Sequence, residues 1–272
     1  MSVNWSDQLK NGFSYGIGFN IFDYKAVVTK YNNPEGLIYN NHTGLVRNKG
    51  YYQGMDLGEI WGYEANDLFL TNQEVDEYLR GVDMSFFKPN KDWQRGDLKY
   101  IDSNGDGKID PGSGTLKDHG DLKIIGNTTP RYSFGLNLHA GYKGFEVSAL
   151  FQGVMKRDFP MAASTYLFSG DSNFFKEHLD YYNVYNPGAY LPRLTKPDSP
   201  EYNANVGYNT SRYLLNAAYM RLKNLMISYN FQPKLVKKMG LENLKVYFTC
   251  DNLFTIDNLP DCLLYTSPSP RD

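Results

Sequence analysis

Hydrophobic and polar residues alternate one by one along several stretches of the chain. The two longest stretches cover residues 12–21 and 132–142, and shorter ones cover 145–152, 224–231 and 244–252. In the two longest, one parity carries Phe13, Tyr15, Ile17, Phe19, Ile21, Tyr132, Phe134, Leu136, Leu138 and Tyr142. The other parity carries mostly Gly, Ser and Asn. Because successive side chains of a strand point to opposite faces, this pattern predicts β-strands with one apolar and one polar face.

The length of these stretches favours a membrane protein. A tilted strand needs roughly nine to eleven residues to cross a bilayer, whereas a β-sandwich strand usually has about five to six. The small side chains of the polar face suit a wet lumen better than a second packed sheet. We therefore expect an all-β fold, a transmembrane antiparallel β-barrel to which this chain contributes about six strands.

Two basic residues fall on the apolar parity of the stretch that ends at Phe231. Arg221 and Lys223 lie at the start of this strand. There a charge that faces lipid costs only about 0–1 kcal/mol, against about 2–4 kcal/mol at mid-depth. We accordingly expect both side chains on the lipid-facing parity, near the membrane surface.

Short and long connections alternate between the predicted strands. Lys143-Gly144 indicates a two-residue hairpin, and 232–243 is a short, lysine-containing turn. The segments 64–130 and 154–216 are long and polar. Outer-membrane barrels combine short periplasmic turns with long external loops. We therefore place 64–130 and 154–216 on the cell exterior, and leave 32–56 unassigned.

Two local features complete this assignment. Thr71 and Glu74 form a capping-box pattern, which predicts a short helix from Asn72 to about Arg80. Residues 261–272 show no strand pattern. We interpret them as a cloning or sequencing artefact, with a natural disordered tail as the alternative. The predicted barrel segment is therefore 1–260.

Composition changes this picture little. The chain has 272 residues and a formal net charge of −2, which by itself implies neither nucleic acid nor anionic lipid as a partner. No run of about 18 apolar residues exists that could form a spanning helix. The 23 Tyr, 16 Phe and 25 Gly suit pleated strands with aromatic girdles, although a secreted β-sandwich could share them. The first residues lack the basic and apolar regions of a signal peptide, so we expect further chain upstream.

Residues 102–110 match the beginning of an EF-hand-type calcium loop. The candidate ligands are Asp102, Asn104, Asp106, the carbonyl of Lys108, and Asp110. Such a loop ends on a bidentate Glu, but Ser113 stands at that position, and Asp118 or Asp121 would have to substitute. A tight turn without metal explains the same residues, so both readings stay open. A bound Ca²⁺ would order an external loop, and no cofactor is required for activity.

Tyrosines crowd the second long segment. They are Tyr166, Tyr181, Tyr182, Tyr185, Tyr190, Tyr202, Tyr208 and Tyr213. Aromatic faces stack on sugars or peptides, which makes Tyr181, Tyr182 and Tyr185 candidate substrate contacts; packing between loops is the alternative. The four histidines lack metal-ligand spacing, and enzyme signatures such as a nucleotide-binding motif are absent from the sequence, so we expect a protein without enzymatic chemistry.

Several motifs, in order, resemble the SusC/RagA family of TonB-linked outer-membrane proteins. They cover residues 54–63, 67–69, 96–110, 125–130, 134–137, 142–145, 192–195, 218–225 and 252–254. The resemblance implies a barrel of about 22 strands that encloses an N-terminal plug, of which this chain would supply the C-terminal part.

The resemblance also implies a function. Members of this family import oligosaccharides or peptides with a SusD-type surface lipoprotein as a lid, and TonB acts on the plug. The implied location is the outer membrane, with lipid around the barrel and no nucleic-acid partner. Two alternatives remain: a passive porin-type barrel, and a secreted β-sandwich that binds carbohydrate.

Overall fold

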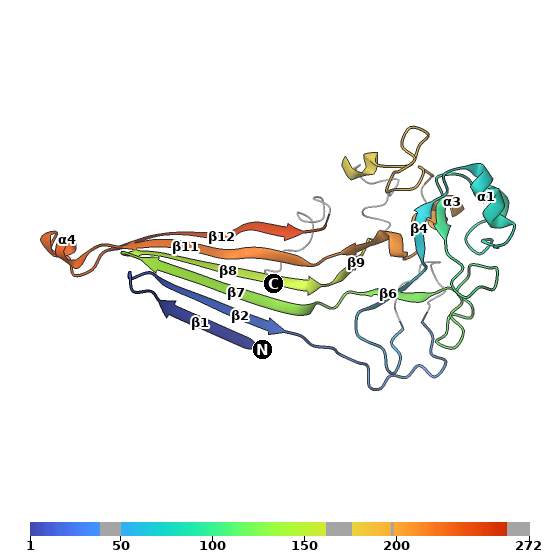
Figure 1. Cartoon of the computed structure of the whole chain (residues 1–272). Helices are drawn as coiled ribbons and strands as arrows, with labels where there is room; N and C mark the ends of the chain where they lie inside the picture. The colour runs from blue at the N-terminus through green and yellow to red at the C-terminus, as the bar shows by residue number, and fades with distance from the viewer. Residues whose placement is uncertain (39–49, 162–175, 197–198, 260–272) are drawn as a thin grey trace. The chain divides into compact units, whose positions relative to one another are not determined.

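The computed structural model describes residues 1–38, 50–161, 176–196 and 199–259 (Figure 1). The chain divides into two compact units. The first is built from Met1–Lys25, Pro130–Arg157 and Asn216–Asn258, and the second from Ala26–Thr129, Asp158–Leu215 and Leu259–Asp272. None of the helices in the described ranges is long and apolar enough to span a membrane.

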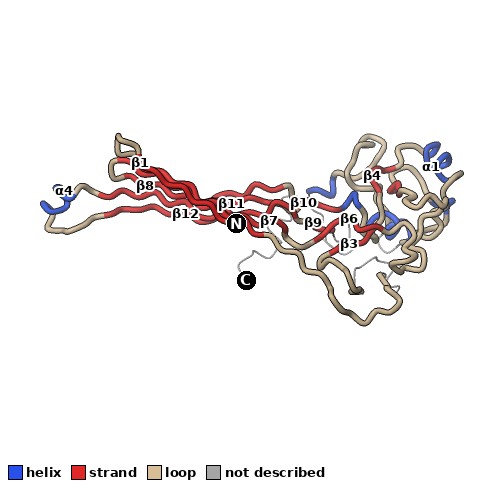
Figure 2. The backbone as a smooth tube through the Cα atoms, turned by 60° about the horizontal axis from the view of Figure 1, so that its bottom comes forward, coloured by secondary structure: helices blue, strands red, loops and turns tan. Residues whose placement is uncertain are grey.

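The first unit is a six-stranded antiparallel sheet in the order β1-β2-β7-β8-β11-β12. Its strands are β1 (Ser2–Gln8), β2 (Ser14–Phe22), β7 (Arg131–Tyr142), β8 (Phe145–Lys156), β11 (Tyr219–Asn230) and β12 (Lys245–Asp257). The strands lie side by side in one layer (Figure 2). Sequence alternation predicted all of them except β1, in which only Val3 and Trp5 mark the apolar parity.

Cross-strand register aligns the apolar positions in rows. One row runs through Ile17, Leu138, Ala149, Leu225 and Cys250, and the next through Phe19, Leu136, Phe151, Leu222 and Phe254. The row between them runs through Gly18, Asn137, Leu150, Asn224 and Asp251, and Leu150 is its one large apolar residue. Residues paired directly across strands share a face. The sheet therefore has one continuous apolar face and one continuous polar face, as the alternation predicts.

The predicted side of Arg221 is wrong because β11 contains a bulge. Its register against β8 shifts between Leu222 and Asn224, so that Lys223 is an extra residue without a β8 partner. One extra residue reverses the parity of the strand beyond it. Arg221 consequently pairs with Gln152 on the polar face, and its Nε donates to Thr255 Oγ1 at 2.9 Å.

The same bulge makes the predicted side of Lys223 wrong. Its place is the inserted position itself, between the two register segments, and not a regular position of the apolar row. Its ammonium donates to Asn252 Oδ1 at 3.3 Å. Arg221 and Lys223 therefore do not face lipid as a pair, and each side chain donates a hydrogen bond to a side chain of β12.

The short connections all lie at one end of the sheet. They join β1 to β2, β7 to β8, and β11 to β12 through the short helix α4 (Pro233–Lys238). In the β7–β8 hairpin both turn residues have positive φ, 48° at Lys143 and 90° at Gly144, as a type I′ turn requires. The long connections β2–β7 and β8–β11 leave from the opposite end, because adjacent strands are antiparallel.

Those two long connections form the second unit. It contains three two-stranded sheets: β3 (Glu59–Gly62) with β6 (Lys123–Asn127), β4 (Ala65–Leu68) with β5 (Leu98–Tyr100), and β9 (Asp158–Pro160) with β10 (Leu214–Asn216). The helices are α1 (Asn72–Leu79) and α3 (Pro200–Val206), with 3₁₀ turns η1 (Asn90–Asp92), η2 (Lys176–Leu179) and η3 (Ser211–Tyr213). Thr71 caps α1 by accepting from the Glu74 amide at 3.1 Å, which confirms the predicted helix.

The main cluster of buried hydrophobic residues in the described chain lies in this second unit. Aromatic rings form its centre: Phe87 stacks on Tyr100 with centroids 4.2 Å apart, and Tyr63 meets both rings edge-on. None of the residues in this cluster belongs to the six-stranded sheet, in which Val154 and Leu222 are buried outside the cluster. The sheet is therefore not organised around a buried interior of its own.

Candidate functional site

The apolar face of the six-stranded sheet is the first candidate surface. Several of its side chains stay exposed, such as Ile17 at 48%, Phe145 at 57% and Phe248 at 64%. Transfer of one such side chain out of water is worth about 1.5–3 kcal/mol. A soluble sandwich would bury these rows against a second sheet, but the first unit is a single layer. Such a face matches an apolar solvent better than water.

Aromatic rings gather on this face near the short turns. Phe13 lies 6.5 Å from Tyr142, and Phe145 lies 4.5 Å from Tyr229, measured between ring centroids. Phe231 extends the group, 4.8 Å from Tyr229. Amphipathic rings at the end of an apolar band are typical of a membrane–water interface. The turn end thus has the composition of an interfacial girdle.

The polar face carries small residues and a network of hydrogen bonds. Asn224 Nδ2 donates to Asp251 Oδ1 at 2.8 Å, and Lys245 Nζ donates to Glu146 Oε2 at 2.7 Å. A Cβ at Gly16 would lie 1.9 Å from the ring of His139, so glycine there makes room for the neighbouring strand's imidazole. This face can contact water and polar solutes, as a lumen does.

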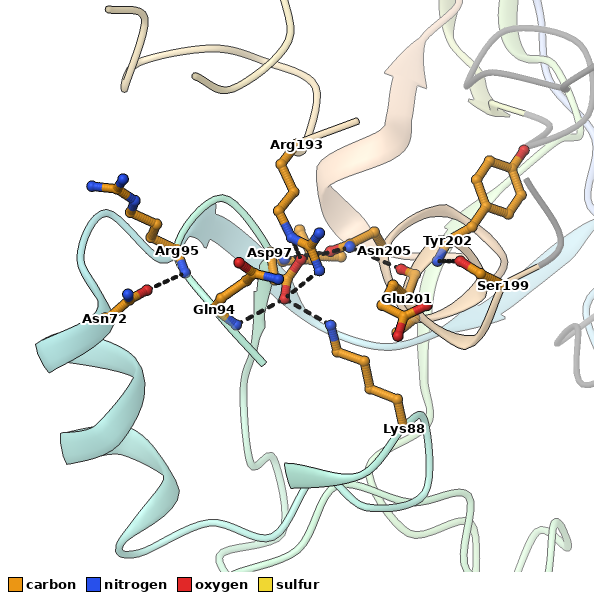
Figure 3. Close-up of polar contacts among 12 residues, drawn as sticks. Asn72, Lys88, Gln94, Arg95, Asp97, Arg193, Ser199, Glu201, Tyr202 and Asn205 are labelled. Atoms are coloured by element: carbon orange, nitrogen blue, oxygen red, sulfur yellow. Dashed lines mark hydrogen bonds and ion pairs between the residues drawn. The ribbon is translucent and has the colours of Figure 1, made fainter. Parts of the chain in front are cut away.

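A buried cluster of charges organises the second unit (Figure 3). Asp97 accepts from Lys88 Nζ at 2.7 Å and from Arg193 Nε at 2.6 Å. Asn205 Nδ2 donates to the same carboxylate at 2.9 Å, and the Gln94 amide donates at 3.0 Å. The carboxylate thereby joins the segment after η1 to Arg193 and to α3.

Burial governs the chemistry of this cluster. The side chains of Lys88 and Asp97 are 0% exposed, and that of Arg193 is 19% exposed. Burial lowers the pKa of Lys88, and the attraction of Asp97 opposes that effect. The Lys88 ammonium also lies 4.3 Å from the centroid of the Trp93 ring. Because this carboxylate is fully buried and accepts from groups of several separate segments, we assign the cluster a structural role.

Sequence analysis did not identify this cluster, although two of its members lie in family-like motifs. Asp97 belongs to the motif 96–110, and Arg193 to the motif 192–195. The Arg193 amide also donates to the Gly96 carbonyl at 2.9 Å. The two motifs therefore meet through both backbone and side chains. Asp97 and Arg193 are 96 positions apart, so the sequence would reveal this contact only if their pairing were already known.

The candidate calcium loop is folded by its own backbone amides. Asp102 accepts from the amides of Gly105 at 2.6 Å and Gly107 at 2.9 Å. Asn104 and Asp106 each accept from the amide two residues on. Among the residues that the structure describes, no three Asp, Glu, His or Cys side chains converge as a metal site. Calcium at Asp102, Asn104, Asp106, Lys108 and Asp110 therefore stays a prediction beside the metal-free turn.

Asp121 is the carboxylate that closes this loop. It is 1% exposed and accepts from the Ser103 amide at 2.7 Å and from the Asp110 amide at 3.0 Å. Burial raises its pKa. Of the two residues considered as substitutes for the missing Glu, Asp121 thus contacts the loop directly. Asp118 instead accepts from the Ser113 amide, at 2.9 Å.

The candidate substrate tyrosines have different environments. Tyr182 is buried in the core and donates to the Leu70 carbonyl at 2.9 Å. Tyr181 packs against the same core, whereas Tyr185 is 94% exposed. The three rings do not share one surface environment, and substrate contact stays a prediction. Tyr166 lies outside the described residues.

Comparison with known proteins identifies similar sequences along nearly the whole chain. TonB-dependent receptor P3 of Formosa agariphila is 26% identical over 264 residues, 95% of this chain and 24% of the relative. Receptor P39 of the same organism is 28% identical over 208 residues, 72% of this chain and 18% of the relative. The predicted resemblance to TonB-dependent receptors is confirmed. The chain spans about a quarter of the length of the first of these curated relatives.

Solved structures agree in fold. The RagAB peptide transporter matches 94% of this chain and 25% of its own, with a TM-score of 0.59 and 16% identity. The RagAB peptide importer in the "open-open" state matches 95% of this chain, also with a TM-score of 0.59. No family model matches the chain. The fold is that of part of a TonB-dependent receptor β-barrel, and these relatives are named as receptors and transporters, not as enzymes.

Proposed function

We propose that the chain forms part of the wall and the external loops of an outer-membrane importer driven by TonB. The observation that carries the proposal is the two-faced sheet, whose apolar rows stay outside the hydrophobic core. Five strands of this sheet, β2, β7, β8, β11 and β12, have 9 to 13 residues, the length that a bilayer requires. Lipid would cover the apolar face, and the polar face would line the lumen.

The external position of 64–130 and 154–216 belongs to the same proposal. These segments lie in the long connections of the sheet, whereas the other end carries short turns. In outer-membrane barrels the long connections are external. The charge cluster at Asp97 would then give the external loops a fixed shape.

For the substrate we propose oligosaccharides or peptides, delivered with a SusD-type lipoprotein as lid. Two observations support this. The similar RagAB structures are named as a peptide transporter and a peptide importer. The polar face of the sheet carries small residues, which can contact polar solutes. TonB would act on the plug of the complete receptor. The passive porin is the remaining alternative, because it shares the strand pattern but needs no energy input.

The experiment that separates these alternatives is uptake in cells that express the complete receptor. Uptake of a labelled peptide or oligosaccharide pool is measured with and without a protonophore, and in a strain that lacks TonB. An importer loses uptake in both cases. Uptake that continues unchanged without TonB would contradict the proposal and favour the porin.

We also carry calcium forward as a proposal for the loop at residues 102–110. The complete receptor is titrated with Ca²⁺ after chelation, beside an Asp106→Asn variant. Saturable binding that the variant weakens supports the metal site. Equal absence of binding in both proteins would leave the metal-free turn as the correct reading.

A further inference from the structure

The short connections of the six-stranded sheet concentrate lysines at one end. Lys10 lies in the β1–β2 turn and Lys143 in the β7–β8 turn, and the α4 connection contributes Lys234, Lys237 and Lys238. All five side chains are exposed. In the described part of the chain none of them forms an ion pair. Their charge is therefore available to another molecule.

Few carboxylates balance these lysines. Glu242 is the single acidic residue in the three connections, 9–13, 143–144 and 231–244. Glu146, at the start of β8, is paired with Lys245 at 2.7 Å. The opposite end of the sheet differs, because Arg131 there is paired with Asp23 at 2.5 Å. The net charge of −2 for the whole chain hides this local excess of positive charge.

The α4 connection also exposes apolar side chains between its lysines. Leu235 is 50% exposed, Met239 61% and Leu241 45%. Val236 is 1% exposed and anchors the turn. Lysines together with exposed aliphatic residues are typical of segments at a lipid surface, where apolar groups reach the acyl chains and ammonium groups reach the phosphates.

Position along the sheet supports the same partner. The aromatic girdle that includes Phe13, Tyr142 and Phe145 occupies the apolar face immediately beside these turns. Such a girdle marks the level of the lipid headgroups. Lys143 follows Tyr142 directly in the chain, and Lys10 and Lys234 lie in the turns next to Phe13 and Phe231, so these lysines would reach the level of the phosphate groups.

We propose that the short-turn end of the sheet binds the headgroups of acidic phospholipids in the membrane leaflet around it. This inference rests on the proposed function, because it requires the apolar face to lie in a bilayer. Each lysine near an anionic surface strengthens binding roughly fivefold. The lysines of α4 select acidic over zwitterionic lipid and hold the short-turn end at the leaflet surface.

The test uses the complete receptor reconstituted in phosphatidylcholine, with a spin-labelled lipid as probe. The association of labelled phosphatidylglycerol with the protein is compared with that of labelled phosphatidylcholine, from the fraction of motionally restricted label. The variant is Lys234→Gln/Lys237→Gln/Lys238→Gln. The matched control removes three exposed lysines of the second unit, Lys91→Gln/Lys117→Gln/Lys196→Gln.

We expect the wild type and the control to prefer phosphatidylglycerol, and the α4 variant to lose that preference at least tenfold. Replacement of the same three lysines by arginine restores it, and added salt weakens it.

Equal association of both lipids with the wild type, or an unchanged preference in the α4 variant, would overturn the inference. So would capture of an acidic periplasmic protein by these lysines without any lipid preference. Absence of restricted lipid of either kind would instead overturn the proposed function, and the inference with it.

Discussion

Replacement of the buried carboxylate Asp97 by asparagine is the sharpest perturbation of the second unit. Asparagine keeps the size of the side chain and can still accept from the Gln94 amide, but it removes the charge that faces Lys88 and Arg193. Lys88 is fully buried and Arg193 is 19% exposed, so both cations would lose their counter-charge out of bulk water. Removal of one partner from a buried ion pair costs about 3–5 kcal/mol.

The assay is hydrogen exchange of the complete receptor, read at the amide of Leu98. This amide donates to Asn205 Oδ1 at 2.7 Å, and Asn205 in turn contacts Asp97. Local opening that becomes easier by about 3–5 kcal/mol accelerates exchange roughly 10²- to 10⁴-fold, since each 1.4 kcal/mol is about tenfold. Glu64→Gln is the control, because its pair with Lys123 is about half exposed, at 38% and 43%, and such pairs contribute about 0–1 kcal/mol.

The pH dependence provides a second signature. Burial already lowers the pKa of Lys88, and loss of Asp97 removes the attraction that opposes this. A lysine with a lowered pKa in the folded state destabilises that state while it is protonated, so the variant should regain protection as pH rises. If Asp97→Asn and Glu64→Gln accelerated exchange equally little, the cluster would not hold the loops together, and the reasoning would be refuted.

Two further predictions concern the sheet. Leu138→Arg places a charge in the middle of an apolar row and should cost about 2–4 kcal/mol of folding free energy in lipid, whereas Asn137→Arg on the polar face should cost far less. The folded fraction of each variant after reconstitution is read as the heat-modifiable band on a gel. Equal folded fractions would contradict the assigned faces. Asp23 has its pKa lowered to about 2 by its hydrogen bonds with Arg131. Its stabilising effect should therefore be present above the ordinary carboxyl pKa and be lost as pH falls toward 2, and an Asp23→Asn receptor should not show that loss in an acid titration.

The sequence predicted the strands because alternation is a local property. Each of the strands β2, β7, β8, β11 and β12 carries enough alternating residues to fix both faces. The strand β1 escaped because it is short and Asp7 interrupts its apolar parity. The bulge at Lys223 was missed as well, although it reverses the phase of the alternation: Leu222 and Leu225 have opposite parities and still lie on one face.

The interior of the second unit was beyond sequence reasoning for a different reason. Asp97 meets Arg193 and Asn205 across 96 and 108 positions, and no local pattern encodes such a pairing. Composition suggested aromatic loops, but not that Tyr182 would be buried while Tyr185 stays exposed. Loops of this length are fixed by long-range contacts, which appear only once the chain is folded.

The central claim is that the apolar rows of the sheet face lipid. A nitroxide scan along β7, one cysteine at a time from residue 133 to 141 in the complete reconstituted receptor, tests it most directly. Relaxation by oxygen, which dissolves in lipid, should be high at Phe134, Leu136 and Leu138, and relaxation by a water-soluble nickel complex should be high at Asn137 and His139. Accessibility to oxygen without a two-residue period, or with the opposite phase, would contradict the account.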